Sequence, residues 1–239
     1  MNTLLIASAS IITIGTIFAL IFILRFRAKL NSGDSTIWER DIRKFEQQDN
    51  EHPQTEGAIL FTGSSSIRYW NTLKEDMAPL PVVNRGFGGS RISDVIHYAE
   101  RIVFPYKPKI LVFYAGENDL SGLFYTKKKT PEEVKNDFHE FCEKIHGQLP
   151  DIPIYFISIK PPKRRKKLWG EMKRANSLVD EFCRTNDLLH YIDIVPPMLD
   201  GDGSPRPELF KWDGIHMNEL GYEIWTSIVK PILLESVQP

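Results

Sequence analysis

The sequence predicts a parallel α/β domain, with one sheet covered on both faces by helices. Five short apolar runs alternate with longer amphipathic segments over most of the 239 residues, which is typical of a buried parallel sheet. Hydrophobic residues make up 42% of the chain and charged residues 26%, as in an ordinary globular domain. The formal net charge of -1 gives no electrostatic reason to expect a nucleic-acid partner.

Each apolar run has the length of a strand, and the segment after it carries apolar residues at helical spacing. The predicted strands are residues 57–63, 81–86, 109–116, 152–159 and 188–194. The predicted helices after them are residues 66–77, 93–103, 131–149, 168–186 and 218–236. Pro131, in the first turn of the third of these helices, favours a helix start there.

The chain opens on an uncharged segment. Residues 1–24 carry no charged side chain and are long enough to cross a hydrocarbon core of about 30 Å as a helix. Arg25, Arg27 and Lys29 follow the apolar run instead of preceding it, which favours an uncleaved anchor over a signal peptide. We therefore expect one transmembrane helix in a single-pass membrane protein. The positive-inside rule places the following domain on the cytoplasmic side.

A short polar linker and an amphipathic helix follow the predicted anchor. Trp38, Ile42 and Phe45 recur at helical spacing, so this helix is expected to pack on the domain or to lean on the membrane. The expected parts are the anchor with its basic flank (1–30), the linker with this helix (31–56) and the α/β domain (57–239).

The two cysteines, Cys142 and Cys183, lie in predicted helices and match no metal-ligand spacing. We expect two buried thiols.

Side chains suited to nucleophilic chemistry follow the predicted strands, and ligands of open parallel sheets bind at that edge. Three serines, Ser64 to Ser66, follow the first strand, and a glycine-rich turn containing Gly88 and Gly89 follows the second. A serine attacks a carbonyl only where an oriented base takes its proton. His216 is a candidate base that Asp213, three residues earlier, can orient. Backbone N–H groups of the glycine turn and the Asn118 amide are candidate donors to an oxyanion.

The D-x-x-H spacing of Asp213 and His216 is not specific by itself, because two other pairs share it. Asp187 and His190 precede the fifth strand and so lie at the wrong end of the sheet. Asp94 and His97 lie on the helix after the second strand, where neighbours three apart are expected to form a solvated pair. The serines have alternatives too: Gly63 to Ser66 fit a turn with a helix N-cap, but neither a P-loop nor a G-x-S-x-G elbow.

Taken together, four stretches resemble the SGNH hydrolases, also called the GDSL esterase/lipase family. FTGSSSI resembles the first motif block, with Ser64 where aspartate is usual and Ser65 at the nucleophile position. NRGFGGS resembles the second block, AGENDL the third and WDGIHMNELGY the last. The resemblance spans about residues 57–236 and assigns Asp213 and His216 to the last block.

The resemblance implies a flavodoxin-like, three-layer α/β/α fold with a five-stranded parallel sheet, and ester hydrolysis without a cofactor. It implies that Ser65 attacks, that His216 is the general base and that Asp213 orients His216. The Ser65 and Gly89 N–H groups and the Asn118 amide would then form the oxyanion hole. Ser66 would start the helix after the first strand.

The implied activity is that of a serine esterase on lipid, lysophospholipid or O-acetyl esters. Two alternatives remain open, an acyltransferase with the same site and a catalytically silent, membrane-tethered binding module. The basic loop Lys160–Lys167 is a second candidate membrane contact, and a solvated loop is its alternative. Four aromatic residues are candidates for lining an acyl or sugar pocket: Tyr125, Trp169, Phe210 and Trp212.

Overall fold

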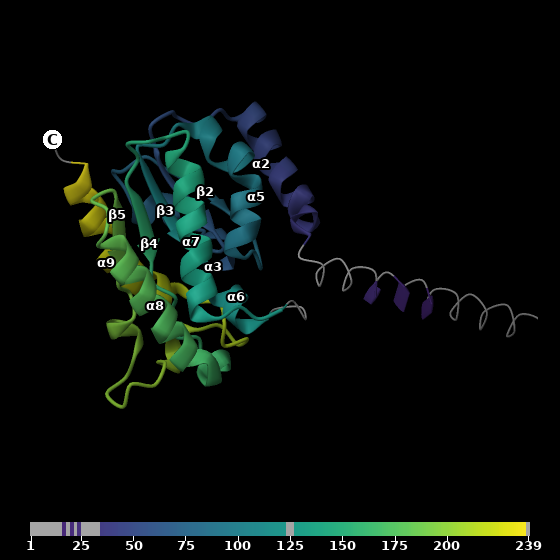
Figure 1. Cartoon of the computed structure of the whole chain (residues 1–239), viewed down its shortest axis with the longest axis vertical. Coiled ribbons are helices and arrows are strands. Elements are labelled where there is room, and N and C mark those ends of the chain that lie inside the picture. Colours follow the sequence, from purple (N-terminus) through teal and green to yellow (C-terminus); the bar gives the residue numbers. More distant parts are fainter. Residues whose placement is uncertain (1–15, 18–19, 22, 25–33, 123–126, 238–239) are drawn as a thin grey trace, which may run out of the picture.

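The computed structural model describes residues 16–17, 20–21, 23–24, 34–122 and 127–237. In this part of the chain, five parallel strands form one sheet in the order β2-β1-β3-β4-β5 (Figure 1). The strands are β1 (Ile59–Gly63), β2 (Val82–Gly86), β3 (Ile110–Tyr114), β4 (Ile154–Ile157) and β5 (Leu189–Ile192). Each lies inside its predicted range, and the strand order is the flavodoxin-like one. The predicted five-stranded parallel sheet is therefore confirmed.

Helices cover both faces of the sheet. One face is covered by α2 (Glu39–Glu51), α5 (Ile92–Ile102), α7 (Pro131–His146) and α8 (Trp169–Cys183). The other face is covered by α3 (Ser65–Arg68), α4 (Leu73–Asp76) and α9 (Glu219–Ser236). A short helix that was not predicted, α6 (Glu117–Ser121), follows β3. The described residues also form the 3-10 turns η1 (Ser35–Trp38), η2 (Phe104–Tyr106), η4 (Lys163–Leu168), η5 (Pro196–Met198) and η6 (Pro207–Leu209).

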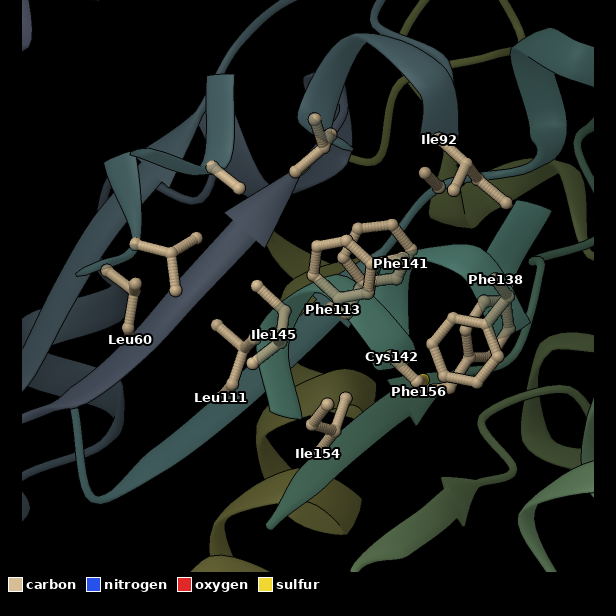
Figure 2. Close-up of a cluster of buried hydrophobic side chains, with 14 of the residues drawn as sticks. Leu60, Ile92, Leu111, Phe113, Phe138, Phe141, Cys142, Ile145, Ile154 and Phe156 are labelled. Atoms are coloured by element: carbon tan, nitrogen blue, oxygen red, sulfur yellow. The ribbon is translucent and has the colours of Figure 1, made fainter. Parts of the chain in front are cut away.

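The core is divided by the sheet into two clusters, because successive strand residues point to opposite faces. Leu60 and Leu111 pack with α7 residues on one face, in the cluster shown in Figure 2. Ile59 and Phe61, the neighbours of Leu60 in β1, pack toward α9 on the other face. Because both faces are covered, the central strands β3 and β4 are apolar throughout and do not alternate with polar residues.

The helix predicted over residues 66–77 is wrong, because the structure has two short helices, α3 and α4, with a turn between them. Trp70 lies in this turn and stacks on Tyr222 of α9, with ring centroids 5.4 Å apart. Its indole N–H donates to Asp76 at 2.6 Å, and the Thr72 hydroxyl donates to the same carboxylate oxygen at 2.7 Å. Tertiary contacts of Trp70 thus override the local helical spacing.

The amphipathic helix α2 packs on the domain. Ile42 is fully buried in the cluster that contains β1 and α5. Arg101 of α5 donates to Glu39 at 2.7 Å and to Glu46 at 2.6 Å, so one arginine holds α2 against α5 at two positions along α2. The hydrogen bonds from Arg101 and Arg43 lower the pKa of Glu39 to about 2.

The predicted membrane anchor falls mostly outside the described residues. Within the described part, no helix has the length and apolar character needed to cross a bilayer.

Candidate active site

Ser65 lies just after the carboxyl end of β1, where Gly63 pairs with Tyr114 of β3. Gly63 ends the strand with φ of +127°, and a Cβ there would lie 2.0 Å from the carbonyl oxygen of Tyr114, so only glycine fits. The Ser64 N–H donates to that oxygen at 2.8 Å. Ser64 takes the extended N-cap position, so α3 begins at Ser65 and not at Ser66. The Ser65 side chain is therefore presented at the sheet edge, in a partly exposed position.

The loop before α9 brings Asp213 and His216 to the same edge. Gly214 has φ of +64° and donates its N–H to Lys211 O at 2.9 Å, while the Lys211 N–H donates to His216 O at 2.8 Å. This closed turn places His216 Nδ1 2.6 Å from Asp213 Oδ2 and His216 Nε2 3.1 Å from Ser65 Oγ. The structure thus brings the three predicted residues into one hydrogen-bonded chain, although Ser65 and His216 are 151 residues apart in sequence.

The Asp213 carboxylate is held in one orientation by three donors. Its Oδ1 accepts the N–H groups of Ile215 at 2.8 Å and His216 at 2.9 Å, and its Oδ2 faces the imidazole. Burial alone would raise the pKa of Asp213, but the hydrogen bonds from the His216 ring and from these two amides lower it to about 2. An ionised Asp213 fixes the imidazole tautomer with its proton on Nδ1, so that Nε2 can accept a proton from Ser65.

The second and third predicted loops meet beside the end of β1. Gly89 has φ of +78°, which turns the chain after β2. The next residue, Ser90, is buried, and its Oγ lies 3.1 Å from Gly63 O and 3.0 Å from Phe87 O. Asn118 Nδ2 donates to Ser90 O at 3.0 Å. The glycine turn and the asparagine are therefore joined to each other and to the β1 terminus.

A buried charge cluster lies behind Asn118, and the sequence interpretation did not include it. Glu117 Oε1 accepts from Arg165 Nη1 at 2.7 Å, and its Oε2 accepts from Lys160 and from the Tyr114 hydroxyl. Arg165 Nη1 also lies 3.3 Å from Asn118 Oδ1. Burial opposes ionisation of Glu117, but the Lys160 and Arg165 charges outweigh it and lower the pKa of Glu117. A glutamate directly before the motif asparagine was the available sequence signal, since a buried carboxylate requires a cationic partner.

Lys160 was included in a basic membrane-contact loop, and that assignment is wrong. Its side chain is 1% exposed and is directed at Glu117, so it cannot reach a lipid surface. The Arg165 side chain, 10% exposed, also turns inward. The exposed basic side chains of the segment are those of Lys163, Arg164, Lys166 and Lys167.

The two rival D-x-x-H pairs lie elsewhere. The expected solvated pair of Asp94 and His97 is wrong: Asp94 is buried and accepts the Ser35 hydroxyl at 2.6 Å and the Arg91 N–H at 2.8 Å, so it caps α5. His190 lies in β5 and stacks on Tyr155, with ring centroids 4.3 Å apart. Neither pair is part of the Ser65–His216 chain.

The remaining predictions concern thiols and aromatic rings. Cys142 and Cys183 are buried free thiols, as expected. Trp169 and Phe210 are buried, and Trp212 is 96% exposed beside Asp213. Tyr125 lies outside the described residues.

Tyr69 is a site residue that the sequence did not indicate. Its ring meets the His216 ring edge-on, with centroids 4.9 Å apart. Arg68 and Lys211 each place a cation within 6 Å of the Tyr69 ring, at 5.6 and 5.5 Å.

Comparison with known proteins identifies the family of the chain. A family model described as the GDSL-like lipase/acylhydrolase family matches residues 33–224. No curated protein sequence matches the chain.

Solved structures share the fold. A Bacteroides fragilis protein assigned as an acylhydrolase superposes with a TM-score of 0.72 at 18% identity, covering 82% of this chain and 97% of that one. A GDSL-like lipase from Bacteroides thetaiotaomicron gives 0.69 at 17% identity, covering 82% and 98%. An acetyl xylan esterase gives 0.62 at 16% identity, covering 76% and 100%. Likeness at such low identity establishes the fold alone, whereas the family match covers most of the chain. The protein is therefore an enzyme that acts on esters, and it belongs to the GDSL-like lipase/acylhydrolase family.

Proposed function

We propose that the protein hydrolyses carboxylic esters through an acyl-enzyme formed on Ser65. The observation that carries the proposal is the hydrogen-bonded chain from Ser65 Oγ through His216 to Asp213. Ser65 Oγ attacks the ester carbonyl while His216 Nε2 takes its proton, and Asp213 stabilises the imidazolium that forms. The tetrahedral intermediate expels the alcohol, which receives the proton from His216. Water then attacks the acyl-enzyme with His216 as base, and His216 returns the proton to Ser65 Oγ as the carboxylic acid is released.

We propose that the oxyanion is stabilised by the N–H groups of Ser65 and Gly89 and by the Asn118 amide. The bond from Asn118 Nδ2 to Ser90 O supports this assignment, because it holds the amide beside the glycine turn. Loss of one such donor typically lowers kcat by about 10²–10³-fold.

The test of this mechanism is hydrolysis of p-nitrophenyl acetate by Ser65→Ala and His216→Ala, each checked by circular dichroism and thermal unfolding. Turnover should fall to background in both variants while folding is retained. The matched control for the histidine is His190→Ala, which removes an imidazole outside the site and should keep turnover. Parental turnover in a folded Ser65→Ala protein would refute the mechanism.

For the substrate, we propose a short acyl group on a polar alcohol such as a sugar. A cleft of about 550 Å³ opens beside Tyr69, which contacts the His216 ring. Polar side chains such as Asn71, Lys211 and Glu219 line it together with apolar ones such as Met217 and Leu220, so it offers hydrogen-bond partners to the hydroxyl groups of a sugar as well as apolar surface to its ring. The exposed indole of Trp212, next to Asp213 in sequence, offers a face on which a sugar ring can stack.

Substrate choice is tested by comparing p-nitrophenyl acetate, p-nitrophenyl palmitate and acetylated xylan as substrates. We expect kcat/KM for the acetyl ester to exceed that for the palmitoyl ester, and acetate to be released from the polysaccharide. A preference for palmitate would favour a lipid substrate instead.

We further propose that residues 1–24 anchor the enzyme in a membrane, with the hydrolase domain on the cytoplasmic side. The support is the uncharged 24-residue segment followed by basic residues. Protease digestion of intact cells expressing the full chain with a C-terminal epitope should leave the epitope intact. Digestion from outside would overturn the orientation.

A further inference from the structure

We infer that Arg165 is a positioning residue for Asn118, and that it sets which way the Asn118 amide faces. The inference rests on the proposed function, because it assumes that the amide donates to the oxyanion. It names a residue outside the four motif blocks, on the 3-10 turn η4.

Both ends of the Asn118 amide have a partner of fixed polarity. Arg165 Nη1 lies 3.3 Å from Asn118 Oδ1, and a guanidinium can only donate, so the atom that faces it must be the amide oxygen. Asn118 Nδ2 donates to Ser90 O at 3.0 Å, and a carbonyl can only accept. A flipped amide would lose both contacts. One Nδ2 hydrogen therefore points to Ser90, and the second remains for the substrate oxygen.

Arg165 is itself held by buried charge. Its Nη1 donates to Glu117 at 2.7 Å, and Glu117 is fixed from the other side by Lys160 and by the Tyr114 hydroxyl at 3.0 Å. The Glu117 side chain is 4% exposed and that of Lys160 is 1% exposed. An uncompensated charge would be unfavourable at this depth, so the cluster holds Arg165 in one position.

The backbone explains why Arg165 turns inward while its neighbours in η4, Arg164 and Lys166, are exposed. Arg165 departs from helical geometry, with φ of -108° and ψ of 23°, inside η4. The preceding residue, Arg164, donates its N–H to Gly214 O at 2.9 Å. The same turn thus touches the Asp213–His216 loop through its backbone and the Asn118 loop through a side chain. Two loops of the site are linked through η4.

The test is a double-mutant cycle between Arg165 and Asn118, measured as p-nitrophenyl acetate hydrolysis by the full chain. Arg165→Met should lower kcat by about 10- to 100-fold, as expected for a misplaced catalytic group, and should leave KM within about twofold, because ground-state binding is unaffected. Arg165→Lys keeps the charge but not the planar fork, so its kcat should fall between that of the parent and that of Arg165→Met. The matched control is Arg174→Met, which removes an exposed arginine paired with Glu132 at 3.5 Å and should leave kcat unchanged.

The cycle separates positioning from any other role of Arg165. In an Asn118→Ala background, Arg165→Met should change kcat by less than about threefold, because its effect passes through the missing amide. A loss of full size in that background, or a kcat for Arg165→Met equal to that of Arg174→Met, would overturn the inference.

The proposed function fails separately, if Asn118→Ala alone keeps parental kcat. If Arg165→Met does not fold, Arg165→Lys decides: parental kcat in that variant would show that the guanidinium is not required.

Discussion

Replacing Asp213 with asparagine tests the geometry of the site most directly. The Asp213 carboxylate accepts from His216 Nδ1 at 2.6 Å and from two backbone N–H groups at 2.8 and 2.9 Å. An asparagine can keep the backbone contacts through its oxygen, but it then presents an NH₂ group to the imidazole. His216 Nδ1 must then be unprotonated in order to accept this hydrogen bond. The ring proton therefore lies on Nε2, which can no longer accept the proton of Ser65. A change of this kind in a serine–histidine–aspartate triad lowers kcat by about 10⁴-fold.

The same substitution has a stability effect that can be worked out from the pKa. The pKa of Asp213 is lowered from 3.8 to about 2, which corresponds at this partly exposed site to roughly 1–2 kcal/mol of stabilisation once solvent screening is included. Because the folded-state value is the lower one, this stabilisation is present above pH 4 and is lost as the pH falls toward 2. Asp213→Asn keeps the backbone contacts but loses the charge that faces His216, so it should be less stable than the parent at pH 7 by roughly 1 kcal/mol, with a difference that shrinks below pH 4.

The assays are p-nitrophenyl acetate hydrolysis at pH 7 and urea unfolding at pH 7 and pH 3. The matched control is Asp187→Asn, which makes the same change in the D-x-x-H pair at the other end of the sheet and should leave activity at the parental level. If folded Asp213→Asn protein keeps kcat within tenfold of the parent, the tautomer argument is wrong.

Two further predictions concern buried positions. Burial raises the pKa of Asp119 from 3.8 to about 7, so the folded state retains a proton that the unfolded state releases, and stability should fall between about pH 4 and pH 7. Asp119→Asn cannot ionise, so its free energy of unfolding in urea should exceed that of the parent by about 2–4 kcal/mol between pH 5 and pH 8. Equal pH dependence of the unfolding free energy in the two proteins would contradict this. Gly63→Ala places a Cβ 2.0 Å from Tyr114 O and should cost more than about 4 kcal/mol or abolish folding. The control Gly201→Ala, with open space around its Cβ, should melt at the parental temperature.

The strands and the four site loops could be predicted because their signals are local. A buried parallel strand is a short apolar run, and the sheet-edge rule then gathers whatever follows each strand. This is sufficient to bring Ser65, Asn118 and the Asp213–His216 pair together from positions far apart in the chain. The break in the helix over residues 66–77 could not be predicted, because it depends on Trp70 meeting α9.

The charge cluster behind Asn118 was missed for a related reason. Glu117 and Lys160 are 43 residues apart, and Glu117 and Arg165 are 48 apart. Neither separation is a spacing that any helix or strand rule connects. In the sequence, Lys160 and Arg165 cannot be distinguished from the other basic residues of the run, which are exposed. Arg165 is directed inward by η4, which contacts α6, whereas Lys160 lies between β4 and η4 and reaches Glu117 from there.

The basic segment therefore has a buried part and an exposed part, and we propose separate roles for them that can be tested apart. The buried pair, Lys160 and Arg165, is tied to Glu117 and so to the chemistry at Asn118. Lys163 and Lys167 are exposed on the same segment, where an anionic surface could attract each by about 1 kcal/mol. Lys163→Gln combined with Lys167→Gln should therefore leave hydrolysis of a water-soluble ester unchanged while lowering sedimentation of the enzyme with anionic phosphatidylserine vesicles. If the pair of substitutions lowers kcat on the soluble ester instead, the exposed lysines act on the site, and the division of the segment is wrong.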